Sequence, residues 1–208
     1  MPDSSNSASA VDAAARVLAA GGIVVYPTET LYGLGADAGN EAALQRLVEL
    51  KGREVGKPVA VLISDTQMVA DIAEEIPAPA ADLMRRFWPG PLTIVLQARP
   101  GVSRVLTGGG DSIGVRASSH PIAMALVRRL GRPLTAPSAN PAGLRPPARC
   151  EEARAYFGAR VDYYLDGGCL PGEPASTVVD ARPALRGQAL RVIRDGAVPA
   201  HLVLQAGA

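Results

Sequence analysis

Aromatic residues, cysteine and histidine are scarce in this sequence, and each shortage argues against a class of protein. Aromatics make up 4% of the 208 residues, which argues against the stacking surfaces that read single-stranded RNA. Cys150 and Cys169 form no CxxC pair, which excludes a zinc site of the usual spacing, and two cysteines in a chain of this size argue against a disulfide scaffold. His120 and His201 lie too far apart in sequence to indicate a metal pair. We expect two ordinary thiols in a reducing cytosol.

The sequence also lacks a charge imbalance and long apolar runs. Its 21 Lys and Arg residues face 20 acidic residues, for a net charge of +1. A dedicated nucleic-acid binder is strongly basic, although a local basic cleft stays open. No apolar run reaches the ~20 residues that a membrane-spanning helix needs, and residues 1–10 lack the regions of a signal peptide. We therefore expect a cytoplasmic protein with no membrane association.

The sequence does contain helical and strand patterns that alternate along one globular chain. Hydrophobic residues make up 48% of it, enough to form a sizeable core. Helical patterns cover residues 9–20, 40–51, 65–75, 80–87 and 120–130. Apolar strand patterns cover residues 22–26, 59–63, 92–96, 112–116, 133–136, 161–165, 177–179 and 190–193. This alternation predicts an α/β fold with one large mixed sheet.

We expect a single domain over residues 9–198, because no repeat or change of composition marks a second one. Residues 1–8 are polar and read as a disordered leader, with Ser9 as the first helix cap. Residues 199–208 read as a loose C-terminal tail.

The familiar nucleotide-binding and hydrolase motifs do not fit. GLGADAG at 33–39 has one residue too many for the dinucleotide fingerprint, and the expected order of strand, glycine turn and long helix is lacking there. GREVGKP at 52–58 is one residue short of a Walker A loop and ends in proline, where Ser or Thr would hold magnesium. There is no GxSxG elbow.

Lys51 is unusual because it continues the apolar stripe of a predicted helix. It lies three and four residues after Val48 and Leu47, on the core-facing stripe, where a cation is unusual unless it extends to solvent or meets an anion. Arg53 and Lys57 follow closely and favour a phosphate or carboxylate site. The alternative is a cation that only stabilises the helix C-terminus.

Other polar residues come where predicted strands end, which is where ligands gather in α/β sheets. Thr28, Glu29 and Thr30 follow the first strand and could read a small polar ligand, or could cap a turn. Arg116 ends a later strand and could pair with a carboxylate or form a surface salt bridge. Ser138 with Asn140, and Ser176 with Arg194, could contact phosphate or ribose, although an Asn-Pro turn also explains Asn140. His120 keeps no assigned role.

These clusters, taken in order, resemble the YrdC/TsaC family of threonylcarbamoyl-AMP synthases. The resemblance covers about residues 10 to 198. It rests on YPTETLYGLG at 26–35, KGR at 51–53, KP at 57–58, FWPGPLT at 87–93, GVR at 114–116, HP at 120–121, APSAN at 136–140, DGG at 166–168 and STVVD at 176–180.

The resemblance implies a twisted, mostly mixed sheet with flanking helices and a concave, positively lined cavity. It implies an enzyme that joins L-threonine, bicarbonate and ATP into threonylcarbamoyl-AMP and pyrophosphate. The product would pass to a transferase that makes threonylcarbamoyladenosine next to the anticodon of tRNA. We expect the short, single-domain form of the family, with Mg²⁺ arriving bound to ATP.

The resemblance also implies roles for individual residues. Thr30 and Arg116 should hold threonine, and Lys51 and Arg53 should be catalytic. The nucleotide should be surrounded by Lys51, Arg53, Ser138, Asn140, Ser176 and Arg194. Two departures stand out. Glu29 replaces a frequent Asp, and Pro-Pro-Ala at 146–148 replaces a stretch with hydroxyls, which Arg145 or Arg149 could offset.

Two other functions stay open at this point. One is a carbamoyl transfer enzyme of the hydrogenase-maturation or antibiotic-tailoring type, although those chains are longer. The other is an RNA-binding or ribosome-assembly protein, and weak RNA binding could also accompany the synthase activity.

Overall fold

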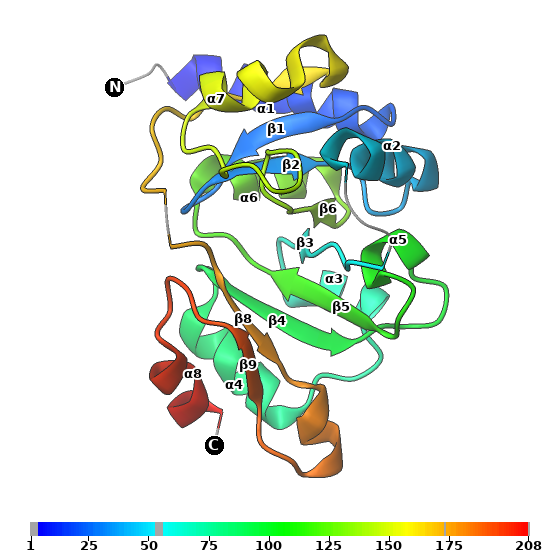
Figure 1. Ribbon diagram of the computed structural model, residues 1–208, viewed down its shortest axis with the longest axis vertical. Coiled ribbons are helices and arrows are strands. Elements are labelled where there is room, and N and C mark those ends of the chain that lie inside the picture. The colour runs from blue at the N-terminus through cyan, green and yellow to red at the C-terminus, as the bar shows by residue number, and fades with distance from the viewer. Residues whose placement is uncertain (1–3, 53–55, 173, 208) are drawn as a thin grey trace.

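The computed structural model describes residues 4–52, 56–172 and 174–207, and it folds into two β-sheets with helices around them (Figure 1). The larger sheet has six strands in the order β6-β3-β5-β4-β8-β9. Their bounds are β3 Val61–Leu62, β4 Leu92–Gln97, β5 Ser112–Arg116, β6 Leu134–Thr135, β8 Thr177–Asp180 and β9 Arg191–Arg194. Parallel pairs (β3 with β5, β4 with β8) alternate with antiparallel ones, so the sheet is mixed as predicted.

The smaller sheet has three strands in the order β2-β1-β7. Its strands are β1 Val24–Pro27, β2 Tyr32–Gly35 and β7 Tyr163–Tyr164. The hairpin of β1 and β2 lies beside β6 of the larger sheet, where the Tyr26 hydroxyl donates to the Thr135 carbonyl at 2.8 Å. The Thr135 hydroxyl in turn donates to the Leu34 carbonyl at 2.9 Å. These buried bonds fix the two sheets edge to edge.

Helices cover both sheets. Their bounds are α1 Ser4–Ala19, α2 Glu41–Lys51, α3 Thr66–Ile72, α4 Ala78–Phe87, α5 Arg104–Thr107, α6 Pro121–Leu130, α7 Cys150–Phe157 and α8 Ala200–Ala206, with 3-10 turns at Gly158–Arg160 and Arg182–Arg186. Helices α1, α6 and α7 contact β1 of the small sheet, and α8 contacts α4 at the far end of the molecule (Figure 1). None of the helices in the described ranges is long and apolar enough to span a membrane.

Helix α2 matches its prediction because its sequence carries both end signals. The Asn40 side chain caps the first turn by accepting from the Ala43 amide at 3.0 Å. Gly52 ends the helix in the left-handed conformation, with φ 55°, which glycine adopts without a Cβ clash. Leu44 and Leu47 are buried, and Lys51 is buried on the same stripe.

Three of the predictions about the fold's outline are corrected. The β-strands form two sheets rather than one, because β1 pairs with β2 and β7, and the β1–β2 hairpin meets the β6 segment through isolated bridges (Gly33 with Ser138, Asp37 with Leu134) and single hydrogen bonds rather than a strand ladder. The first helix begins at Ser4, within the predicted leader, since several serines precede Ser9 and sequence alone did not single out the cap. The predicted tail contains α8, which is held by the buried Val203.

Candidate active site

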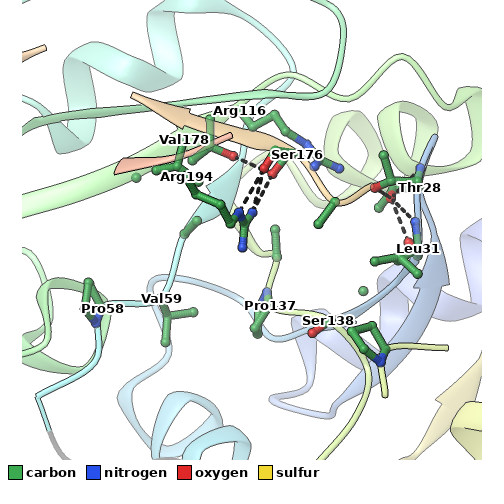
Figure 2. Close-up of a pocket in the computed structure, with 18 of the residues that line it drawn as sticks. Thr28, Leu31, Pro58, Val59, Arg116, Pro137, Ser138, Ser176, Val178 and Arg194 are labelled. Atoms are coloured by element: carbon green, nitrogen blue, oxygen red, sulfur yellow. Dashed lines mark hydrogen bonds between the residues drawn. The ribbon is translucent and has the colours of Figure 1, made fainter. Parts of the chain in front are cut away.

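A pocket of about 310 Å³ lies where the two sheets meet (Figure 2). One wall comes from the β1–β2 turn and the other from β4, β5, β8 and β9. Its lining consists of Thr28, Thr30, Leu31, Tyr32, Gly33, Pro58, Val59, Ala60, Thr93, Val95, Ser112, Gly114, Arg116, Ala136, Pro137, Ser138, Pro146, Ala175, Ser176, Val178 and Arg194. The charged members of this lining are both arginines, so the pocket suits an anion.

Arg194 reaches this pocket from β9, the edge strand of the large sheet. Its guanidinium donates to the Ser176 carbonyl at 2.7 Å and to the Ser176 hydroxyl at 3.1 Å. It forms no ion pair with a described carboxylate. Partial burial and the positive charge of Arg116 lower the pKa of Arg194, which places the two guanidinium groups in each other's field. An anion between them would relieve this repulsion.

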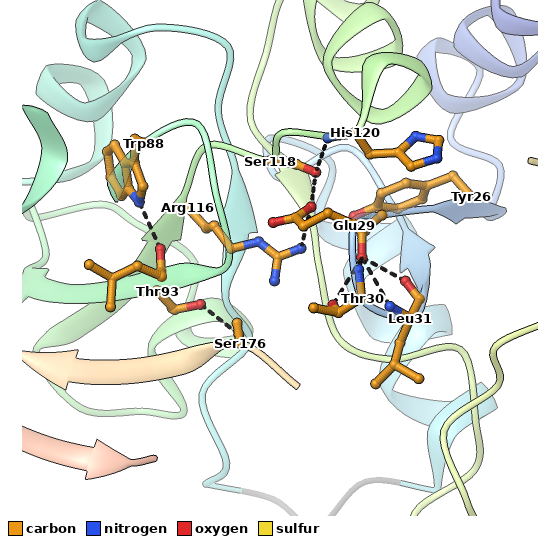
Figure 3. A network of polar contacts seen from close by, with 12 residues as sticks. Tyr26, Glu29, Thr30, Leu31, Trp88, Thr93, Arg116, Ser118, His120 and Ser176 are labelled. Carbon is orange, nitrogen blue, oxygen red and sulfur yellow. Dashed lines mark hydrogen bonds and ion pairs between the residues drawn. The ribbon is translucent and has the colours of Figure 1, made fainter. Parts of the chain in front are cut away.

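Ser176 and Thr93 place two buried hydroxyls next to each other in the pocket (Figure 3). Their oxygens lie 3.1 Å apart, because β8 runs parallel to β4 and pairs Thr93 with Val178, two residues after Ser176. A hydroxyl can donate or accept, so this pair can adjust to a phosphate or carboxylate oxygen without a change of backbone.

Arg116 is 7% exposed and is paired with the Glu29 carboxylate, with Nη2 to Oε2 at 3.5 Å. The Ser118 hydroxyl donates to the same Glu29 oxygen, and the His120 amide donates to that hydroxyl at 3.2 Å. Burial lowers the pKa of His120, while the Glu29 charge opposes the shift. Strand β5 and the turn into α6 are thereby tied to the β1–β2 turn (Figure 3).

The β1–β2 turn presents two buried threonines to the pocket. The Thr28 hydroxyl donates to the Leu31 carbonyl at 2.7 Å and lies 3.3 Å from the Thr30 hydroxyl. Thr28 therefore caps the turn through its hydroxyl, which is the alternative to ligand binding that the sequence left open. Thr30 lines the same wall with its hydroxyl next to that turn.

Lys51 lies behind the pocket rather than in its lining. Its side chain is buried, and its ammonium donates to the carbonyl oxygens of Ser138 and Asn140 at 2.5 and 2.7 Å. The Asn140 amide group donates to the Leu144 carbonyl at 2.7 Å and to the Pro141 carbonyl at 2.9 Å. Lys51 and Asn140 together fix the loop that carries Ser138 into the pocket.

The structure brings most of the predicted site residues together. Those that line the pocket are Thr30, Arg116, Ser138, Ser176 and Arg194. Lys51 and Asn140 support one loop of it, and Arg53 lies outside the described residues. Pro146 lines the pocket where the family's hydroxyls were expected, whereas Arg145 and Arg149 are exposed and do not.

Sequence reasoning missed two polar residues of this region, Thr93 and Ser118. Thr93 ends the FWPGPLT motif, and its place in that motif was the signal that could have found it. Ser118 carried no signal, because its role depends on Glu29, which is distant in sequence. The expectation of two ordinary thiols fits the structure, where both cysteines are free and burial raises the pKa of Cys150 to about 11.

The fold and the pocket define a mixed α/β domain with a cavity between two sheets, which Arg116 and Arg194 line. A family model for Sua5, YciO and YrdC proteins, described as "Telomere recombination", matches residues 16–196. The match covers most of the chain, so the chain belongs to this family.

Several relatives carry the name threonylcarbamoyl-AMP synthase. The chain is 41% identical over 167 residues to the one from Pyrococcus abyssi, covering 80% of this chain and 49% of that one. It is 40% identical over 169 residues to the one from Halorhodospira halophila, covering 81% and 88%. The chain thus spans about half the length of the archaeal relative and most of the bacterial one.

A solved structure supports the same assignment of fold. The crystal structure of P. abyssi Sua5 complexed with L-threonine matches with a TM-score of 0.88 at 38% identity, covering 94% of this chain and 56% of that one. The two-sheet arrangement is therefore that of a Sua5 domain.

Proposed function

We propose that this chain is an L-threonylcarbamoyladenylate synthase, a nucleotidyltransferase that uses L-threonine, bicarbonate and ATP. The observation that carries the proposal is the pocket between the sheets, which joins Arg116 and Arg194 to a set of buried hydroxyls. The names of the relatives support the same activity, and so does the L-threonine bound to P. abyssi Sua5.

The reaction has two steps that the pocket suits. The threonine amine attacks bicarbonate carbon, and loss of water leaves a carbamate. A carbamate oxygen then attacks the α-phosphorus of ATP, the bond to the bridging oxygen breaks, and pyrophosphate leaves. No protein nucleophile is needed, because holding the reactants in line can contribute as much as covalent catalysis.

The two arginines offset the repulsion between these anionic reactants. Two like charges 4 Å apart repel by about 4 kcal/mol at an effective dielectric near 20. Arg116 would grip the threonine carboxylate, next to Thr30, and Arg194 would face the phosphates with Ser176. Fixed donors of this kind stabilise charge without reorganising.

The loop of Ser138 and Asn140 would hold the nucleotide on the other side. The Lys51 ammonium lies behind this loop, so its charge would act on the phosphates through the loop backbone. Arg53 would be the second catalytic cation, beside Lys51.

Mg²⁺ would arrive with ATP and would neutralise part of the phosphate charge. The described pocket lining offers hydroxyls, such as those of Ser138 and Ser176, and no carboxylate. Among the described residues no group of three or more His, Cys, Asp or Glu could hold a metal. A metal held mainly by phosphates and water fits this donor set.

The product would pass to a tRNA threonylcarbamoyl transferase in the cytoplasm. A carbamoyl transferase would instead consume carbamoyl phosphate, and an RNA-binding protein would give a salt-dependent RNA shift without ATP turnover.

Pyrophosphate release tests the proposed activity. With ATP, L-threonine and bicarbonate together, we expect pyrophosphate to be released. Added pyrophosphatase converts it to free phosphate, which is measured. Omission of threonine or bicarbonate should reduce the signal to background. Release that does not depend on threonine would exclude the proposal.

A further inference from the structure

Two unpartnered polar atoms point to a role for Glu29 that the proposed function does not include. Glu29 Oε1 and Arg116 Nε are both buried and hydrogen-bond to none of the described residues. They belong to the two members of one ion pair, whose other atoms, Oε2 and Nη2, lie 3.5 Å apart. An unpaired buried polar atom is costly, so two of them in one pair need an explanation.

The geometry of a guanidinium explains both atoms. Nε and Nη2 form one edge of the group and can bind the two oxygens of a single carboxylate. The Glu29–Arg116 pair has one of these two contacts, and the second contact would join the two unpartnered atoms. The neighbouring edge, formed by Nη1 and the second N–H of Nη2, then stays available to a ligand.

Glu29 itself is absent from the pocket lining, whereas Arg116 belongs to it. The Glu29 carboxylate is held from behind by the Ser118 hydroxyl, which accepts from the His120 amide (Figure 3). Ser118 is fully buried, so the chain of bonds from α6 to Glu29 is shielded from water. The hydrogen-bonding route from Glu29 to a ligand in the pocket therefore runs through Arg116.

We propose that Glu29 is a positioning residue that, with Ser118, holds one guanidinium edge of Arg116 so that the neighbouring Nη1–Nη2 edge binds the carboxylate of an amino-acid substrate. The Glu29 charge also balances Arg116 beside Arg194, which has no described carboxylate partner. The effect of Glu29 on the KM for L-threonine rests on the proposed function, whereas the geometry of the Glu29–Arg116 pair does not.

Glu29→Gln tests the kinetic consequence. The glutamine amide has one acceptor oxygen and one donor nitrogen, so it cannot accept from both Nε and Nη2 of Arg116 with its two polar atoms. We expect the KM for L-threonine to rise at least about 10-fold, with the KM for ATP and kcat at saturating threonine unchanged. Ser118→Ala should shift the threonine KM in the same direction by less.

Asp180→Asn is the matched control. Asp180 is also buried and pairs with two arginines, Arg182 at 2.9 Å and Arg191 at 3.2 Å, outside the pocket. Asp180→Asn should lower the midpoint temperature of thermal unfolding and leave the KM for L-threonine unchanged. An unchanged threonine KM in Glu29→Gln, or equal rises for threonine and ATP, would overturn the inference.

The Arg116 Nε–H resonance tests the geometry without any substrate. This resonance is identified in ¹H–¹⁵N spectra by its loss in Arg116→Lys. Its proton should exchange slowly with solvent in the unmodified chain and rapidly in Glu29→Gln. Rapid exchange in the unmodified chain would overturn the side-on pairing. Lack of threonine-dependent turnover in the unmodified chain would instead refute the proposed function and leave this spectrum to decide the pairing.

Discussion

Lys51→Met is expected to lower the free energy of unfolding by about 3 kcal/mol and to remove most turnover. Methionine keeps the apolar stem but cannot donate to the carbonyl oxygens of Ser138 and Asn140, which Lys51 binds at 2.5 and 2.7 Å. The loop would then lose its buried anchor, and Ser138 would lose its place in the pocket. Urea unfolding and threonine-dependent pyrophosphate release measure the two effects.

Arg129→Met serves as the control for Lys51→Met. Arg129 pairs with Asp12 at 2.7 Å, but both side chains are largely exposed, and such pairs contribute about 0–1 kcal/mol. Normal stability of Lys51→Met with a raised KM for ATP would mean that Lys51 contacts the nucleotide directly. Normal stability and normal turnover together would remove Lys51 from the site.

Arg116→Lys is expected to raise the KM for L-threonine about 100-fold, equivalent to about 2.8 kcal/mol. Lysine keeps the charge but loses the planar fork that can bind Glu29 on one edge and a carboxylate on the other. Initial rates at varied threonine and saturating ATP give this value, and the KM for ATP should change little.

Arg191→Lys is the control for Arg116→Lys, because Arg191 pairs with a buried carboxylate but its side chain is 69% exposed. It should leave both KM values unchanged. A threonine KM in Arg116→Lys that equals that of the unmodified chain would show that Arg116 does not hold the substrate carboxylate.

The elements that the sequence predicted well are those whose signals are local. Helix α2 has its Asn40 cap and its Gly52 end in the sequence itself. Strand β5 has the predicted bounds, Ser112–Arg116, because a short run of small and β-branched residues ends at Arg116, shortly ahead of a helix start. The local sequence alone therefore placed Arg116 at the end of a strand.

The parts of the fold that the sequence did not predict depend on distant partners. The apolar runs at 59–63, 133–136 and 161–165 did predict β3, β6 and β7, but these strands have two residues each, so the sheet that each one joins is set by pairing rather than by periodicity. Helix α7 was not predicted, and α8 depends on the burial of Val203. The division into two sheets follows from these long-range pairings.

The candidate site shows the same limit. The ordered motifs contain residues that line the pocket, such as Arg116 and Ser176. They could not show that Lys51 faces a backbone loop, or that Ser118 supports Glu29, since both depend on contacts between segments far apart in the sequence.

The fate of labelled bicarbonate tests the central claim most directly. The unmodified chain is incubated with ATP, L-threonine and ¹³C-bicarbonate, and the nucleotides are analysed by mass spectrometry. We predict a threonine-containing adenylate that carries the ¹³C label and forms only when all three substrates are present. Release of pyrophosphate with no labelled adenylate, or an adenylate of threonine without the label, would contradict the account.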